Sequence, residues 1–513
     1  MLVDAIHAVK QRRRFSGNAL IHADVLSAVC QIEISDCQEA RRSISSATIG
    51  MRICLTMVNR DPFRLWVSRN LQPIAFLGAY FATIVAGNVI FATPLGTASL
   101  KATGFSPRIL DMDQMFTPGY WALLLCPFVL TPLVVYLTKR GAQPLIAKAS
   151  AILPDFSGVE YLVFLSVCYA FVFYQFWQAD VAALFLSGTD AVSSVNARFA
   201  IHDRIGYGTL MVLQALLPFL AIYSMLRWMR SGGRFWLVAM VGNIFMMSIL
   251  LIMLNMKWPV LLFYIGLVMA VFVNAKRHAY VKAAIGTIFL VASFLMISSF
   301  VYRLAPETQA DEPKIAAVEP TFAKTKVARA SRIAAETSTQ AFTHAPTILF
   351  AALNRMAVIY PYYYQTFTTE GAVCGGILEQ AKPGPKCRAS TFIYSRIFGV
   401  AEGYTDKGTS PQSVHISGYA MGGWPMALLA LACGSFLVGL FACLPLDKNT
   451  SIGSLAVVGA LAGYHLSQVP GEGVILFDHG LLWTFLMLGI FMAWRGVLRI
   501  LGQSPATQMK PAE

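Results

Sequence analysis

Cationic side chains are the first residues in this sequence that could carry chemistry. They flank apolar stretches on one predicted side of the chain, and they are Arg198, Arg204, Lys257, Arg303, Arg355, Arg388 and Arg396. A guanidinium donates two parallel hydrogen bonds to a phosphate, whereas an ammonium binds it as a point charge. We therefore expect this group to bind an anion, such as a lipid headgroup or the pyrophosphate of a lipid-linked sugar.

A second candidate is His415, which lies in the stretch SPQSVHISGYAMGGW at residues 410–424. Histidine is the side chain that most often acts as a general acid or base. A lone histidine near the end of an apolar stretch is more often a hydrogen-bonded packing residue, so both interpretations stay open. Tyr419 is expected either to pack or to contact the substrate. The glycines of this stretch favour close helix packing or a sharp re-entry into the membrane; they are Gly418, Gly422 and Gly423.

Cys374 and Cys387 flank a turn rich in glycine and proline. A short loop closed by a disulfide in an oxidising compartment is the interpretation we favour, and two unrelated free thiols are the alternative. No CxxC or Cys/His spacing typical of a structural zinc site occurs in the sequence.

Acidic residues offer a rival chemistry. The triplet Asp111-Met112-Asp113 could bind a divalent metal, although such triplets are common by chance. A second cluster, formed by Glu472, Asp478 and His479, could orient an acceptor sugar or could be a solvated turn.

The composition indicates the class of protein to which these residues belong. The chain has 513 residues, of which 56% are hydrophobic and 13% are charged. A soluble chain carries about a quarter charged residues. A water-soluble enzyme and a disordered scaffold are therefore excluded, and an all-α polytopic membrane protein remains. The net charge of +14 is explained by basic cytoplasmic loops rather than by nucleic acid.

Apolar windows predict about ten membrane spans. They lie near 71–93, 118–137, 159–179, 207–226, 235–254, 258–274, 283–302, 424–444, 453–470 and 479–494. Alternate connections are basic, and their cations include Lys139, Arg140, Arg227, Arg230, Lys276 and Lys448. This alternation predicts that both termini are cytoplasmic.

Five regions follow from these spans. Residues 1–56 form a cytoplasmic tail or an over-extended start, and residues 57–302 form a first bundle of about seven helices. Residues 303–423 form a large outer loop, residues 424–498 the last three helices, and residues 499–513 a second cytoplasmic tail. The large loop is expected to be helical from Val327 to Phe367, with a break at Pro346. Its tyrosine-rich end, residues 360–364, would suit contact with headgroups or sugars.

This combination resembles a known family. The apolar spans, the late outer loop, the outer arginines and the stretch 410–424 together are similar to the Wzy-like O-antigen or exopolysaccharide polymerases and the related O-antigen ligases. The resemblance covers about residues 57–500 and implies a C-type glycosyltransferase-like fold. The sequence departs from the family at Lys257, which stands where a Gly-Ser-Arg-like turn is expected.

The resemblance implies an inverting, metal-independent glycosyl transfer without a cofactor, at the periplasmic face of the bacterial inner membrane. The donor would be an oligosaccharide on undecaprenyl pyrophosphate, and the acceptor a sugar hydroxyl on a second lipid-linked repeat. Arg355 and His415 are then the expected catalytic residues. The pyrophosphate and the glycan would be bound by Arg198, Arg204, Lys257, Arg396 and Tyr419. Membrane lipid and a chain-length regulator protein are the further partners that the resemblance suggests.

Several alternatives stay open. The same donor and cations would serve a ligase. Related membrane glycosyltransferases place an acidic pair in this loop, so the aspartate triplet would suit a metal-dependent transferase that uses polyprenyl-phosphate sugars. A cationic cavity would suit a flippase or exporter of lipid-linked glycans. The cations also have structural interpretations. Arg355 could form a plain salt bridge or contact a headgroup, Arg198 and Arg204 could pair with Asp203, Arg396 could anchor the loop, and Lys257 could extend to the headgroups.

Overall fold

The structure is a computed structural model. It describes residues 62–97, 110–111, 115–187, 191–254, 257–275, 278–296, 345–376, 388–398, 409–446, 449–468 and 481–500. The chain divides into two compact units, 1–66 and 67–513, and the fold that follows is that of the second. Within the described ranges every secondary-structure element is a helix, so the all-α prediction is confirmed for them.

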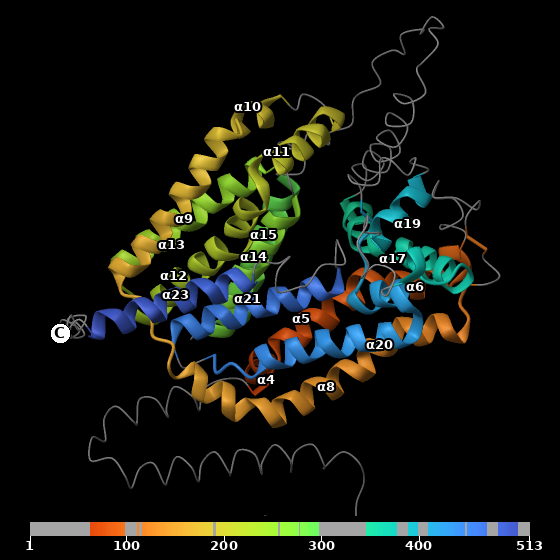
Figure 1. Cartoon of the computed structure of the whole chain (residues 1–513), viewed down its shortest axis with the longest axis horizontal. Coiled ribbons are helices and arrows are strands. Elements are labelled where there is room, and N and C mark those ends of the chain that lie inside the picture. Colours follow the sequence, from red (N-terminus) through yellow and green to blue (C-terminus); the bar gives the residue numbers. More distant parts are fainter. Residues whose placement is uncertain are drawn as a thin grey trace, which may run out of the picture. The chain divides into compact units, whose positions relative to one another are not determined.

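Figure 1 shows the described helices in chain order. The first half of the chain contains α4 (Pro62–Arg69), α5 (Leu71–Tyr80), η2 (Phe81–Val85), α6 (Ala86–Phe91), α8 (Pro118–Ser150), α9 (Gly158–Gln178), α10 (Val181–Leu186), α11 (Ala191–Met211), η4 (Val212–Leu216), α12 (Leu217–Ser231) and α13 (Arg234–Met253). The second half contains α14 (Lys257–Asn274), α15 (Ala279–Met296), α17 (Ala345–Thr369), η6 (Val373–Gly375), α19 (Ala389–Phe398), α20 (Val414–Ala442), α21 (Thr450–Ser467) and α23 (Leu481–Ile500).

Seven helical stretches of the described chain are long and apolar enough to cross a membrane. They are Leu71–Phe91, Pro118–Ser150, Gly158–Gln178, Ala197–Ser231, Arg234–Met253, Val414–Ala442 and Leu481–Leu498. Shorter apolar helices occupy Pro259–Asn274 and Ala279–Ser293, and α21 occupies the remaining predicted span. Each predicted span thus overlaps a described helix, while the count of ten spans stays a prediction.

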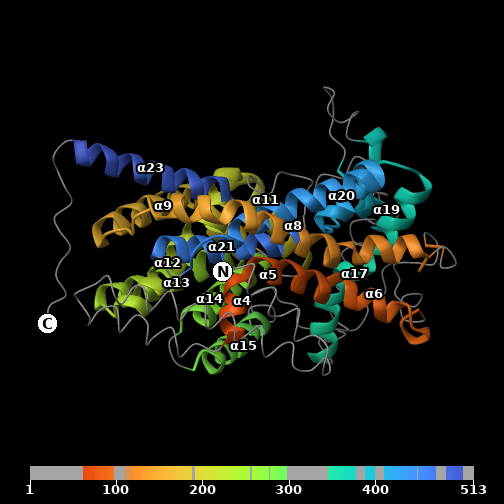
Figure 2. The same ribbon diagram turned by 90° about the horizontal axis from the view of Figure 1, so that it is seen from below.

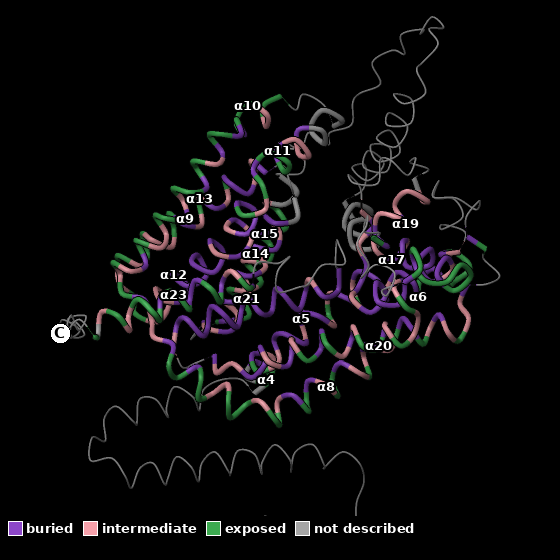
Figure 3. Tube along the Cα trace, in the orientation of Figure 1, coloured by how far each residue is buried: buried purple, intermediate pink, exposed green. Residues whose placement is uncertain are grey.

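Helix α21 is the most enclosed of these elements, and it packs on α5, α12, α14 and α20. Small residues permit this close packing. A Cβ on Gly459 would lie 2.3 Å from the Phe441 ring, and a Cβ on Gly463 would lie 2.7 Å from the Gln72 carbonyl oxygen. Gln72 in turn donates from Nε2 to the Ala456 carbonyl, at 3.0 Å. In Figure 3 α21 and α12 are largely buried, whereas α9 and α13 carry exposed residues.

One end of the bundle is fastened by charged groups. Asp155 Oδ2 accepts from Arg227 at 2.7 Å, and Asp155 Oδ1 accepts from the Thr450 backbone N–H at 2.8 Å, at the start of α21. Arg495 donates two hydrogen bonds to the Glu160 carboxylate, at 2.7 and 2.6 Å. Two of the basic residues near predicted span ends, Arg227 and Arg495, thus form ion pairs that connect helices.

The helices form two groups. The first contains α9 to α15 and α23, and the second contains α6, α8, α17, α19 and α20. Helices α5 and α21 pack on each other and connect the two groups. α8 and α20 lie side by side in both views, as do α14 and α15 (Figures 1 and 2). Helix α11 packs on α9, α10 and η4, whereas α17 packs on η2, α6 and α20. Helix α19 packs on α20. This division decides which candidate residues meet.

Helix α17 occupies part of the helix predicted for the outer loop. It begins at Ala345, so Pro346 lies in its first turn, where a missing N–H costs nothing. Residues 327–344 lie outside the described part of the chain. Pro361 lies inside α17 without ending it.

Candidate functional site at the start of helix 20

Helix α20 consists of two arms that fold back on each other. The backbone leaves the helical region at Gly422 (φ −172°, ψ 27°) and Gly423 (φ 67°, ψ −155°). A Cβ on Gly418 would lie 2.9 Å from the Ala430 Cβ, although twelve positions along one straight helix span about 18 Å. The first arm, 414–421, therefore runs antiparallel to the second arm, 424–442. The chain reverses sharply where the glycines predicted a re-entry, and the second arm starts where the eighth span was predicted.

The first arm places His415 in a closed hydrogen-bonded environment. His415 has no exposed surface. Its Nε2 lies 3.2 Å from the Leu123 carbonyl oxygen of α8, and its Nδ1 lies 3.0 Å from Ser413 Oγ. A carbonyl can only accept, so Nε2 carries the proton and Nδ1 is left as an acceptor. Ser413 Oγ has a single hydrogen and faces both Nδ1 and the Leu466 carbonyl oxygen, which is 3.2 Å away. The Tyr80 hydroxyl, 3.3 Å from Nε2, donates to the Leu124 carbonyl at 2.8 Å.

This arrangement assigns His415 a structural role in the described conformation. The one nitrogen that could accept a proton already faces Ser413, and the ring has no exposed surface that an acceptor sugar could reach. A general base must lie within hydrogen-bonding distance of the proton that it removes. The structure thus favours the packing interpretation of His415, and we leave its base role out of the function proposed below.

Helix α17 is anchored by buried tyrosines. Tyr360, with no exposed surface, donates to the Tyr120 carbonyl at 2.7 Å, and Tyr363 donates to the Ser410 carbonyl at 2.9 Å. Burial raises the pKa of Tyr360 well above its ordinary value of 10.0, so it stays a neutral donor. The expectation that residues 360–364 contact headgroups or sugars was wrong, because all five residues are buried in the protein.

Asn88 connects α17 to the membrane helices. Its Nδ2 donates to the Ile84 carbonyl at 2.8 Å and to the Ala357 carbonyl of α17 at 3.2 Å, while its Oδ1 accepts from the Tyr120 hydroxyl. The preceding π-helical turn η2 packs directly on α17. Such turns inside α-helices often occur at functional sites. The sequence offered no pattern that linked Asn88 to the outer loop.

Tyr419 is also part of this packing. Only 6% of Tyr419 is exposed, and its hydroxyl lies 2.9 Å from Thr368 Oγ1 at the end of α17. Its ring stacks on Tyr364 with centroids 6.1 Å apart and meets the edge of Trp424. The structure therefore favours the packing role for Tyr419 over contact with a substrate.

Arg396 on α19 forms a two-pronged ion pair with Glu370. Its Nη2 donates to Glu370 Oε2 at 2.6 Å, and its Nη1 donates to Oε1. The guanidinium also lies over the Phe392 ring, with Cζ 4.7 Å from the centroid. Both side chains remain accessible, at 36% for Arg396 and 46% for Glu370. Arg396 thus anchors the loop, and Glu370 is a charged residue of this site that sequence reasoning missed.

Arg198 and Arg204 lie elsewhere, on the part of α11 that precedes a break at Gly206 (φ 71°, ψ 167°). The Arg198 guanidinium lies over the Phe199 ring, 4.9 Å from its centroid. Arg204 is exposed and makes no ion pair with any residue that the structure describes. The ion pair with Asp203 that we considered for Arg204 is therefore not formed, and these two cations do not join the group around α17.

The remaining candidates are placed only in part. Arg355 lies on α17 and Lys257 begins α14, but their side chains are outside the described atoms. Cys374 is not among the free cysteines, yet Cys387 lies outside the described residues, so their disulfide stays a prediction.

Asp111 is exposed, and its backbone N–H donates to Gln365 Oε1 at 3.0 Å. Residues 112–114 and the acidic cluster Glu472, Asp478 and His479 are not described.

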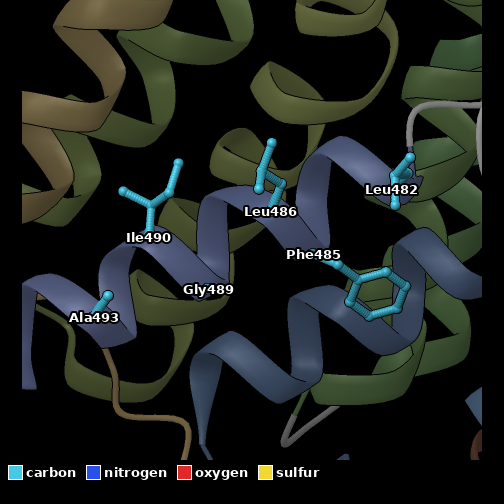
Figure 4. A pocket seen from close by; sticks show the side chains of 6 residues that line it. All are labelled: Leu482, Phe485, Leu486, Gly489, Ile490 and Ala493. Atoms are coloured by element: carbon cyan, nitrogen blue, oxygen red, sulfur yellow. The ribbon is translucent and has the colours of Figure 1, made fainter.

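Two features of the described chain bear on ligand binding. No group of three or more His, Cys, Asp or Glu residues in it could hold a metal ion. A shallow hollow on α23 is lined only by Leu482, Phe485, Leu486, Gly489, Ile490 and Ala493 (Figure 4). This hollow offers no polar side chain for a sugar or a phosphate, and its surface suits lipid chains.

Comparison of the chain with protein-family models, curated proteins and solved structures finds no significant match. The function must therefore be argued from the residues and their geometry.

Proposed function

We propose that the protein is a membrane glycosyltransferase that polymerises oligosaccharide repeats carried on undecaprenyl pyrophosphate. The reaction would take place at the periplasmic face of the bacterial inner membrane. The acceptor hydroxyl attacks the anomeric carbon of the donor sugar, and the bond from that carbon to the pyrophosphate oxygen breaks. The pyrophosphate leaves with the electron pair and with its negative charge.

One observation supports this proposal most directly. The arginine-bearing helices α17 and α19 pack on the folded-back helix α20, where buried tyrosine and asparagine hydrogen bonds fix α17. Arg355 and Arg396 thereby lie on helices that pack against a helix apolar enough to span a membrane. Cations held near a leaving pyrophosphate would stabilise the charge that develops on it.

Arg204 supplies a second source of positive charge. It is exposed two residues before the break at Gly206, near the start of the apolar stretch Ala197–Ser231. A guanidinium at the edge of the membrane can bind a lipid pyrophosphate through two parallel hydrogen bonds. Since Arg204 lies on a different group of helices from α17, we assign it to binding of the lipid carrier rather than to the leaving oxygens.

The test uses the full-length protein in liposomes with a purified undecaprenyl-pyrophosphate-linked repeat. We expect the wild-type protein to produce a ladder of longer lipid-linked chains, also in the presence of a chelator. Arg204→Ala should lower the rate at low donor concentration about 10- to 100-fold, the value of one charged hydrogen-bonding group. Arg140→Ala is the matched control, because Arg140 is an exposed arginine on α8 outside the proposed site.

The products separate the alternatives. A wild-type protein that produces no longer chains from this donor would overturn the proposal. Transfer of a preformed glycan to a different acceptor would indicate a ligase, and loss of all transfer with chelator would indicate a metal-dependent transferase. An Arg204→Ala rate equal to that of Arg140→Ala would remove Arg204 from the site.

A further inference from the structure

The ion pair between Arg396 and Glu370 joins the two outer helices. Glu370 directly follows α17, and its backbone N–H donates to the Thr366 carbonyl at 2.8 Å. Arg396 lies in the last turn of α19 and uses both terminal nitrogens on the Glu370 carboxylate. The Phe392 ring, one helical turn before Arg396, supports the guanidinium from one side.

This pair is built to exchange partners. About a third of the Arg396 side chain and almost half of the Glu370 side chain are accessible, and such exposed pairs contribute little to stability. The planar fork that fits a carboxylate fits a phosphate equally well. A pyrophosphate carries more negative charge than a carboxylate and therefore competes well for the same fork. The cation can stay over Phe392 while its anionic partner changes.

Glu370 lies at the C-terminal end of α17, and release of Arg396 changes what its carboxylate can do. The C-terminal end of a helix carries partial negative charge, which opposes a carboxylate placed there. While Arg396 is bound, it neutralises the Glu370 carboxylate beside the end of α17. After Arg396 leaves, the carboxylate has lost its charged partner and stays accessible. A freed Glu370 is thus an open hydrogen-bond acceptor for a hydroxyl.

We propose that Arg396 and Glu370 form an exchangeable ion pair that couples donor binding to activation of the acceptor, an inference that rests on the function proposed above. The donor pyrophosphate takes the Arg396 fork, and the freed Glu370 carboxylate becomes the general base. Glu370 removes the proton of the acceptor hydroxyl as its oxygen bonds to the anomeric carbon. The carbon–oxygen bond to pyrophosphate breaks, its electron pair leaves with the pyrophosphate, and protonated Glu370 later returns the proton to water.

The coupling has a functional benefit. Without a donor, Glu370 is held by Arg396 and does not activate a hydroxyl. Only a bound pyrophosphate releases it, so water or a stray sugar is not activated before the donor is in place. Glu370, an accessible carboxylate, thereby takes the general-base role that was first expected of His415.

The first experiment measures chain extension and donor binding for full-length Glu370→Gln in liposomes. Glutamine keeps the shape of the side chain but cannot accept the proton, so the rate should fall about 100-fold or more, the contribution typical of a general base. Binding of the lipid-linked donor, measured separately, should stay the same or become tighter because Arg396 is less strongly held. A Glu370→Gln rate equal to that of an active wild-type protein would overturn this inference and leave the proposed polymerase function standing.

Exchanging the two charges tests whether the pair takes part in the reaction or only joins α17 to α19. The double variant Arg396→Glu, Glu370→Arg can re-form the ion pair with its charges reversed. If the pair only joins α17 to α19, the double variant should regain most of the activity lost by either single variant. Our inference predicts no recovery, because the carboxylate and the guanidinium are then on the wrong helices. Recovery to within about tenfold of wild type, less than the effect of a general base, would contradict it.

Asp180→Asn provides the matched control for the loss of one carboxylate. Asp180 is exposed between α9 and α10 and has a positive φ of 50°, a conformation that asparagine also tolerates. This variant should retain the wild-type rate and donor binding. A wild-type protein without transfer activity would instead refute the proposed function itself, and that result is distinct from any outcome for Glu370.

Discussion

Gly418 lies against Met426 across the reversal of α20, so closely that a Cβ on Gly418 would stand 2.7 Å from the Met426 carbonyl oxygen. No real side chain tolerates that distance to a backbone atom. The two arms of α20 can therefore pack only because residue 418 has no side chain. The reversal in turn places His415 and Tyr419 against α5, α8 and α17.

Gly418→Ala should consequently destabilise the protein by about 1–3 kcal/mol, the usual cost of overpacking. Thermal unfolding in detergent measures this effect. Gly489→Ala is the matched control, since Gly489 is also helical and a Cβ there would meet nothing within 4 Å. Equal unfolding temperatures for the two variants would contradict the antiparallel packing of the arms.

Asn88→Ala should loosen α17. It removes a donor to the Ala357 carbonyl and leaves the Tyr120 hydroxyl without its acceptor, at a cost of about 1–3 kcal/mol for the buried group. Hydrogen exchange should increase in Ala345–Thr369 more than in α13. Thr287→Ala removes an exposed hydroxyl that bonds only within α15, and it should change neither. Unchanged exchange in α17 would refute the anchoring role of Asn88.

Alkaline pH should weaken the same region. Burial raises the pKa of Tyr362 from 10.0 to about 12. The folded protein therefore holds this proton more tightly than the unfolded chain, so the associated stability is complete below pH 10 and is lost as the pH rises towards 12. The unfolding temperature should fall in that interval, and it should fall less in Tyr362→Phe. Identical pH profiles would show that Tyr362 is not responsible.

Arg355→Ala should abolish polymer formation while the protein still inserts into the membrane. Arg355 lies on α17, the helix that Tyr360 and Asn88 connect to the membrane helices, and the substitution removes a cation that we expect to bind the pyrophosphate. The measurement compares polymer length in cells with the amount of protein in the membrane fraction, and Arg140→Ala again serves as control. Wild-type polymer levels in Arg355→Ala would remove this residue from the catalytic group.

The positions of the membrane helices could be predicted from the sequence because they depend on local hydropathy. The reversal at Gly422 and Gly423 was also foreseeable, since adjacent glycines permit a positive φ. The N-terminal part of α11 could not be predicted from the sequence. Its helix continues through Arg198 and Arg204 before the break at Gly206, and no apolar pattern marks that part.

The partners of the site residues could not be predicted, because they come from distant parts of the chain. Glu370 and Arg396 are 26 positions apart across a loop, and His415 meets Leu123, 292 positions away. Tyrosines near a predicted membrane edge suggested exposure to headgroups. Only the packing of α17 on Tyr120, Asn88 and Ser410 reveals that their hydroxyls are used inside the protein.

The most direct test of the polymerase function is the lipid-linked glycan profile of a strain that lacks the protein. Lipids are extracted and analysed by mass spectrometry, and the membrane face of each species is assigned by its accessibility to an external enzyme. We predict single repeats on undecaprenyl pyrophosphate at the outer face, together with loss of long polymer. Single repeats confined to the inner face would indicate a flippase and would contradict the account, as would long chains that accumulate on the carrier, which would indicate a ligase.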